Sequence, residues 1–210
     1  MPPTTDQLRS YQVMFDHFNR ELFGDKLPHV ILNFSRDLKR AVGYYAVKRW
    51  ESQERRVDEI TLNPDHLKRG PQATAATLVH EMVHLWQQTY GKPSRAGYHN
   101  HEWADKMQEV GLIPSSTGEP GGRRVGQQMT HYVAESGAFL RSFKALALEL
   151  PWQSEGQRVA TTKYAKPTQM SGRSRLPCMS ICPLCRIGPY TPQEKTVNAM
   201  ESPTSSIRTA

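Results

Sequence analysis

The feature that most constrains this chain is one apolar stretch that carries two histidines and a glutamate. Residues 76–86 read ATLVHEMVHLW, so apolar side chains cover the predicted helix on nearly all sides. A helix with that pattern is buried. Because a helix advances about 100° per residue, His80 and His84 share one face about 40° apart, and Glu81 stands at its flank.

Two imidazoles on adjacent turns can bind one metal ion, while a flanking carboxylate can reach a water on that ion. This is the H-E-x-x-H arrangement of zinc hydrolases. The alternative is a metal-free core helix whose histidines hydrogen-bond to backbone carbonyls. Buried His and Glu side chains are costly unless they are paired or coordinated, and metal binding would remove that cost.

A third metal ligand must come from outside this helix, because catalytic zinc usually has three protein ligands and an open fourth position. His99 is our first choice, since a helix predicted to begin at about residue 98 would place it near that open position. His101 is the second candidate and His131 the third.

The rest of the pattern predicts an α+β fold in which a small antiparallel sheet packs on helices. The central helix, expected over residues 71–90, carries the motif. Other helices are expected over residues 5–22, from about residue 98, and over 138–149, and strands over 30–34, 43–50 and 57–62. Residues 114–128 read as a long glycine-rich loop, in which Arg123 and Arg124 are candidate phosphate contacts.

Length and charge indicate one domain with an appendage. The chain has 210 residues and a net charge of +7, of which residues 1–150 carry +2 and residues 151–210 carry +5. We therefore expect a catalytic domain over 1–150 and a basic, largely flexible tail over 151–210, with DNA as a candidate partner. Neither a signal-peptide pattern nor an 18-residue apolar run is present, which favours a cytoplasmic protein without membrane contact. The oligomeric state stays open.

All three cysteines lie near the C-terminus, at Cys178, Cys182 and Cys185. That placement argues against a disulfide framework and for a reducing compartment. The three thiols form an incomplete zinc-ribbon-like cluster, so a second metal site in the tail is a candidate and a frayed tail is the alternative.

The motif, followed by Gly97 and the run YHNHEW over residues 98–103, resembles the SprT-like family, which includes the Spartan proteases. The likeness covers roughly residues 8–150 and includes the strand that ends in ITLN at residues 60–63. Family members have a later metal-binding His in an H-G-x-x-[FW] element, which His99 matches, with Asn100 in place of the usual glycine. Family members also typically end in a zinc ribbon with two Cys-x-x-Cys pairs, of which this chain has one.

The resemblance implies a zincin-like fold and an endopeptidase with one catalytic Zn²⁺, held by His80, His84 and His99. Glu81 would be the general acid/base, and Tyr98 or Tyr132 a candidate oxyanion stabiliser. Substrate would add to the sheet edge, for which residues 57–62 are our candidate. The implied substrates are proteins attached to DNA. The alternative function is a zinc-stabilised, DNA-associated regulatory or adaptor protein with little proteolytic activity.

Overall fold

The first helix, α1 (Pro3–Phe23), opens with a proline at a position where a missing N–H costs nothing. It ends at Gly24, whose φ of 64° is the left-handed conformation that terminates helices. The structure is a computed structural model and describes residues 1–36, 41–147, 150, 152 and 154. One face of α1 is buried and contributes Met14, Phe15 and Phe18 to the core.

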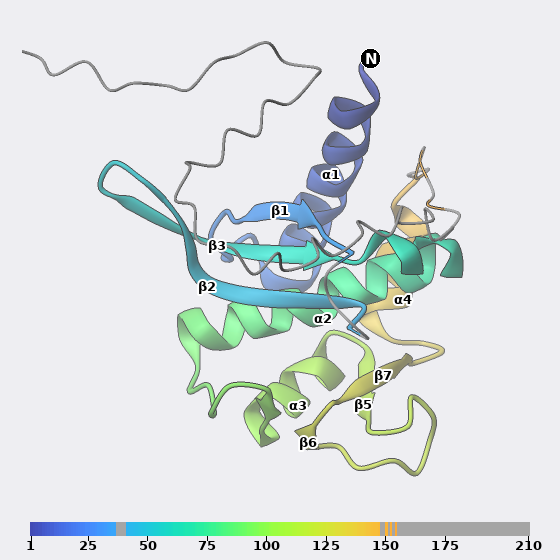
Figure 1. Cartoon of the computed structure of the whole chain (residues 1–210). Helices are drawn as coiled ribbons and strands as arrows, with labels where there is room; N and C mark the ends of the chain where they lie inside the picture. The colour runs from blue at the N-terminus through green and yellow to red at the C-terminus, as the bar shows by residue number, and fades with distance from the viewer. Residues whose placement is uncertain (37–40, 148–149, 151, 153, 155–210) are drawn as a thin grey trace, which may run out of the picture. The chain divides into compact units, whose positions relative to one another are not determined.

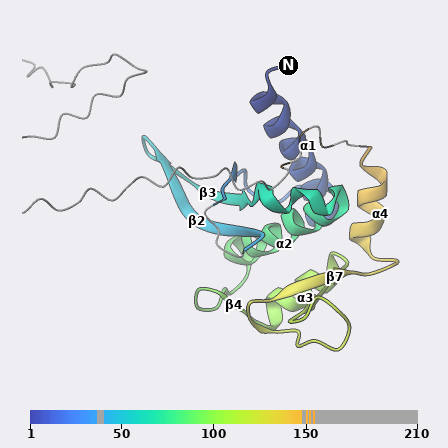
Figure 2. The same cartoon turned by 45° about the vertical axis from the view of Figure 1, so that its right-hand side comes forward.

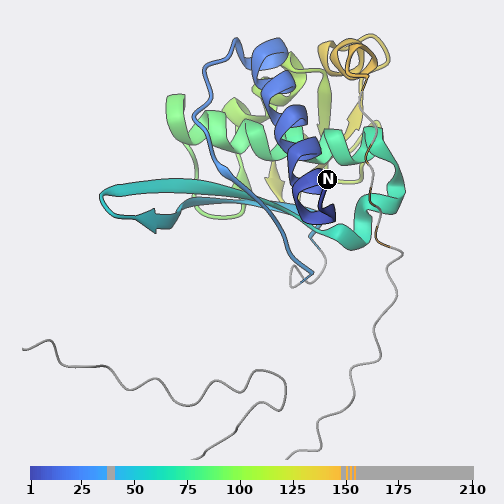
Figure 3. The same ribbon diagram turned by 90° about the horizontal axis from the view of Figure 1, so that it is seen from above.

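Three strands follow, at the positions that the sequence predicts: β1 (Ile31–Phe34), β2 (Gly43–Ser52) and β3 (Arg55–Leu62). β2 and β3 form an antiparallel hairpin that projects away from the helices, and its outer half is exposed (Figures 1 and 3). β1 pairs with β3 in parallel, with Ile31 opposite Glu59. The strand order is therefore β1-β3-β2.

Two sequence expectations about this sheet are wrong. The sheet is mixed rather than antiparallel, because β1 pairs with β3 and both run opposite to β2. The ring of Phe34 packs edge-on against Tyr11 of α1, with centroids 4.7 Å apart, which holds β1 on the side of β3 away from β2. Residues 57–62 are therefore not a sheet edge, since β3 is paired on both sides and the edge strands are β1 and β2.

The central helix α2 (Pro71–Tyr90) follows a short 3₁₀ helix, η1 (Pro64–Arg69). Nearly every residue of α2 from Thr74 to Val83 is buried, as its all-round apolar pattern predicts. The sheet lies on one side of α2, and α1 crosses it (Figures 1 and 3). Side chains of α2 accordingly form the centre of the main hydrophobic core.

The elements after α2 are β4 (Tyr98–His99), α3 (His101–Glu109), β5 (Leu112–Ser115), β6 (Gly126–Gln127), β7 (Thr130–Val133) and α4 (Ala138–Ala145). The part from β4 to β7 forms a second layer beside α2, in which α3 packs on β5, and α4 lies outside this layer and packs on α1 (Figure 2). β4 pairs with β6 and β5 pairs with β7, both antiparallel. The loop predicted over 114–128 thus has short strands at both ends. The helix expected over 138–149 ends earlier, at Ala145.

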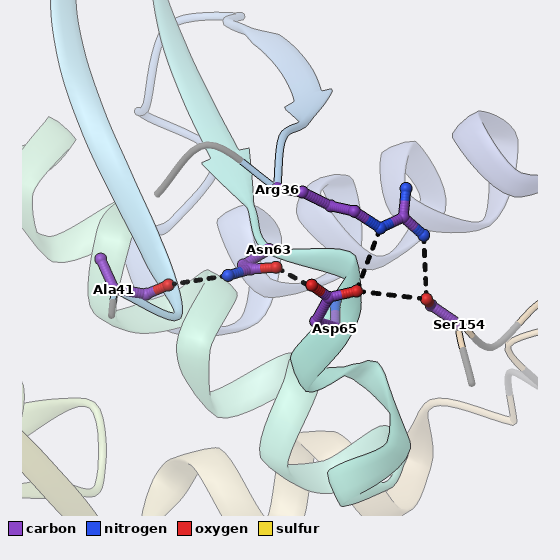
Figure 4. A network of polar contacts seen from close by, with 5 residues as sticks. All are labelled: Arg36, Ala41, Asn63, Asp65 and Ser154. Atoms are coloured by element: carbon purple, nitrogen blue, oxygen red, sulfur yellow. Dashed lines mark hydrogen bonds and ion pairs between the residues drawn. The ribbon is translucent and has the colours of Figure 1, made fainter. Parts of the chain in front are cut away.

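A polar network holds the end of β3 next to the start of β2 (Figure 4). Asn63 donates from Nδ2 to the carbonyl of Ala41 (3.2 Å), and its Oδ1 accepts from the backbone N–H of Asp65 (3.1 Å). The carboxylate of Asp65 in turn pairs with Arg36 at 3.0 Å, and Arg36 also donates to Ser154. The network therefore fixes where β2 begins.

The architecture confirms a mixed α+β fold with small sheets packed against helices. Within the described residues, no helix combines the length and apolar character needed to cross a bilayer. The division into residues 1–150 and 151–210 stays a prediction, because most of the second segment lies outside the described residues.

Candidate metal centre

Helix α2 presents the two histidines and the glutamate of the motif to one side of the core. The rings of His80 and His84 lie one turn apart, with centroids 5.3 Å from each other. His80 is 9% exposed and Glu81 6% exposed, so both functional groups are largely shielded from water. The apolar residues around the helix produce this burial.

His99 lies on β4, not in the first turn of a helix as expected from the sequence. The side-chain oxygen Oδ1 of Asn100 caps α3 by accepting from the N–H of Trp103 (3.0 Å), so the helix begins only at His101. His99 is thereby left extended and pairs with Gly126 of β6. Its Nδ1 lies 3.1 Å from the carbonyl oxygen of Gly126 and donates to it, which leaves the Nε2 lone pair free.

A polar clamp fixes β4 and α3 to the C-terminal end of α2. Gln87 donates from Nε2 to Asn100 (2.7 Å) and to Glu102 (2.8 Å). Glu102 also accepts from the backbone N–H of Lys92 at 2.7 Å. The clamp places His99 against the turn of α2 that carries His84.

The three imidazoles converge. One ring nitrogen from each of His80, His84 and His99 lies within 4.8 Å of the others, and the Nε2 atoms of His84 and His99 are 3.1 Å apart. Ligands on a tetrahedral zinc with bonds of 2.0–2.1 Å stand about 3.3 Å from one another. The indole of Trp103 packs against all three rings, at 4.3–5.4 Å between centroids. The donor set therefore fits a metal ion.

Burial keeps these imidazoles neutral, which is the form that binds a cation. Desolvation lowers the pKa of His84 to about 3, with a further contribution from His99. The pKa of His80 falls well below its usual value, and that of His99 is also lowered, in both cases mainly by burial.

The carboxyl group of Glu81 borders strand β2. A Cβ added to Gly43 would lie 3.2 Å from Oε1 of Glu81, so the strand and the carboxyl group are in close contact. Burial raises the pKa of Glu81 to about 8. A divalent cation on the neighbouring histidines would favour the ionised carboxylate.

Two cavities of about 570 and 640 Å³ flank Glu81. Both are lined by five shared residues, Gly43, His80, Glu81, Gln128 and Met129. The first cavity continues along β2 and past Tyr98, while the second continues toward Arg69 and His131. The candidate centre thus lies where two hollows meet.

The other candidate residues are distributed differently. Tyr98 lines the cavity beside the histidines, whereas Tyr132 lies between His131 and Val133 on β7 and faces the opposite side of that strand. His101 is exposed, and His131 contacts His80 instead of joining the three-histidine cluster.

The candidate phosphate contacts Arg123 and Arg124 are exposed residues of the loop that follows β5. Arg124 is paired with Asp105 of α3 at 2.8 Å, and Arg123 is exposed. The three cysteines lie outside the described residues. Their roles stay predictions.

Sequence reasoning missed three contributors to this site. Gly43 borders Glu81, and Gln87 with Glu102 forms the clamp on β4. For Gly43 the sequence did offer a signal, because a glycine in a strand often marks a place where another group approaches the backbone closely. Nothing in the local pattern indicates the clamp, because its partners are 15 residues apart.

Comparison with models of protein families finds a match. The model of the SprT-like family matches residues 11–121, more than half of the 210 residues. The chain belongs to the SprT-like family. The family suggests a metalloprotease-like domain, and SprT-like domains are metal-dependent. The match includes the three clustered histidines and Glu81 but ends before β6 and β7. A search of curated proteins finds no match.

Proposed function

We propose that this SprT-like protein is a zinc-dependent endopeptidase with a zincin-like active site on α2. One observation carries the proposal: three imidazoles, two of them buried and that of His84 half-buried, converge beside a buried carboxyl group at the junction of two cavities. A purely structural helix has no need for that convergence, because a neutral histidine in a core is satisfied by a carbonyl.

In the proposed site His80, His84 and His99 hold the zinc. Zinc bound by three histidines supplies Lewis-acid chemistry and lowers the pKa of a water toward about 7. Glu81 accepts the proton of the attacking water and returns it to the departing amine. Tyr98, which lines the same cavity, is the candidate donor to the developing oxyanion.

The edge strand β2 is the proposed binding site for substrate. Its residues Gly43, Tyr44, Tyr45 and Val47 line the cavity beside the histidines. A peptide that adds to this edge in extended form would bind through backbone hydrogen bonds, which give affinity with little sequence selectivity. We therefore expect a peptidase that cleaves many different sequences and binds each of them as an extended strand along β2.

We further propose that the substrates include proteins attached to DNA. The support is the family resemblance and the net charge of +7. Among the candidate phosphate contacts, Arg123 is exposed, whereas Arg124 is already paired with Asp105. DNA contact through this loop would therefore depend mainly on Arg123.

The test is to compare the purified wild type with Glu81→Gln on casein and on a DNA-bound protein, each with and without single-stranded DNA. Glu81→Gln is expected to retain one zinc per chain and lose cleavage, by at least about 100-fold for a missing general base. Unchanged cleavage by the variant would defeat the proposal. A zinc-loaded wild type without cleavage would favour the regulatory alternative.

Metal content gives an independent check on the ligand set. His99→Ala is expected to lose zinc, because it removes one of three protein ligands. His101→Ala is the matched control, since this histidine lies two residues away and is exposed. Equal zinc content in the two variants would contradict the assignment of His99.

A further inference from the structure

His131 of β7 lies against His80. Their Nδ1 atoms are 3.1 Å apart and their ring centroids are separated by 5.3 Å. β7 pairs with β5, where His131 stands opposite Pro114, so the imidazole is carried by a paired strand and not by a free loop. Two side chains 51 positions apart in the sequence therefore meet beside the metal cluster.

The contact decides which nitrogen of His80 is available for a metal. A neutral imidazole has one N–H and one lone pair. If Nδ1 of His80 carries the N–H and donates it to His131, the lone pair left for a metal belongs to Nε2. His80 then donates, and Nδ1 of His131 accepts.

His99 follows the same arrangement with a different acceptor. Its Nδ1 donates to the carbonyl of Gly126, and its Nε2 faces His84. Metal-binding histidines almost always donate their second N–H to an acceptor, which fixes the tautomer and the ring orientation. His131 occupies for His80 the position that the Gly126 carbonyl occupies for His99.

A direct ligand role for His131 fits the geometry less well. The cluster of mutually close nitrogens among the described residues is formed by His80, His84 and His99. His131 instead lies within hydrogen-bond distance of His80, with the two Nδ1 atoms 3.1 Å apart.

We propose that His131 is a positioning residue that orients His80 and fixes its tautomer for metal binding. The inference rests on the metal centre of the proposed function and does not depend on peptidase activity. It assigns a role to a residue that lies beyond the matched family segment, residues 11–121.

A pair of nearly isosteric variants isolates the hydrogen bond. In His131→Asn the side-chain oxygen replaces Nδ1 as acceptor, whereas His131→Leu has a similar shape and no acceptor. Tyr132→Phe on the same strand is the control, because its side chain faces away from the cavities. Zinc affinity is measured by competition with a chromophoric chelator, and the imidazole tautomers of the metal-free protein by ¹⁵N NMR.

We expect His131→Leu to weaken zinc binding by about 10- to 100-fold. His131→Asn and Tyr132→Phe are expected to stay within a few-fold of the wild type. In the metal-free wild type, His80 should carry its proton on Nδ1 and His131 on Nε2, and His131→Leu should lose this preference at His80.

Three results would overturn the inference: wild-type zinc affinity in His131→Leu, equal losses in the Leu and Asn variants, or His80 protonated on Nε2. Peptidase activity is a separate readout. A wild type that binds zinc without cleaving peptides, while the Leu and Asn variants still differ in affinity, would defeat the peptidase proposal and support the role of His131.

Discussion

Gly43 is the residue of strand β2 that borders the carboxyl group of Glu81. A Cβ at this position would approach Oε1 of Glu81, the carbonyl oxygen of Thr61 and the side chain of Leu62 at 3.1–3.2 Å. Contacts this short require the neighbours to move. The absence of a side chain therefore lets the edge strand and the general base lie side by side.

Replacing Gly43 with valine is expected to displace Glu81 without touching the histidines. We expect kcat to fall by about 10- to 100-fold, since small misplacements of a catalytic group carry costs of this order. Zinc content should stay that of the wild type. Ala46→Val on the same strand is the control, and equal activity of the two variants would contradict the placement of Glu81 beside β2.

Between β3 and η1, a single side chain joins two elements to the start of β2. Asn63 caps η1 through Oδ1 and holds Ala41 through Nδ2, and its backbone N–H donates to Val42 at 2.8 Å. The start of β2 is the part of the strand next to Glu81. The conformation of this junction thus affects the geometry of the candidate centre.

Asn63→Ala removes the cap and the bond to Ala41 together. The free energy of unfolding is expected to fall by about 1–2 kcal/mol, measured by urea denaturation. Asn63→Ser keeps a capping oxygen but is too short to reach Ala41, so it should fall between the wild type and the alanine variant. An alanine variant as stable as the wild type would show that the junction is held by other contacts.

At the scale of the whole molecule, the burial of titratable groups in and beside the metal centre makes stability depend on pH. Burial lowers the pKa of His84 to about 3 and that of His131 to about 4, and it also lowers the pKa of His80 well below its usual value. Glu81 has the opposite shift, to about 8. Below pH ~6.5 the unfolded chain binds protons on histidines that the folded chain leaves neutral.

The metal-free protein is therefore expected to be most stable near pH 6.5. Stability should fall below that pH as the unfolded histidines take up protons. It should also fall between pH ~6.5 and 8, by about 1.4 kcal/mol per unit, because the unfolded chain has ionised Glu81 and the folded chain has not. Urea denaturation of chelator-treated protein across this range measures both limbs.

The variant Glu81→Gln separates the two limbs. It should abolish the decline above pH 6.5 and leave the acid limb in place. Saturating zinc should also remove the decline, since a nearby cation favours the ionised carboxylate. If the free energy of unfolding of Glu81→Gln falls above pH 6.5 as steeply as that of the wild type, groups other than Glu81 cause the decline.

Local patterns in the sequence accounted for much of the fold. Apolar spacing predicted α1 and α2 to within a few residues, and the predicted strand positions are confirmed. The spacing of His80 and His84 implied that their rings share a face, because a helix repeats every 3.6 residues. The family suggested by the motif is also confirmed. All of these features depend on residues close together in the chain.

Tertiary structure decided how these pieces pair. β1 lies against α1 and pairs in parallel with β3, which is the central strand of the sheet. The Asn100 cap and the pairing of β4 with β6 brought His99, and not His101, to the cluster. The contact of His131 with His80 depends in the same way on β7. Sequence alone therefore determined α1, α2, the strands β1 to β3 and the two motif histidines, since short-range periodicity governs them, and it named His99 as the first candidate for the third ligand. The sheet order, the short strands β4 to β7 and the neighbours of the three histidines required the folded chain, because contacts between distant segments are settled only by packing.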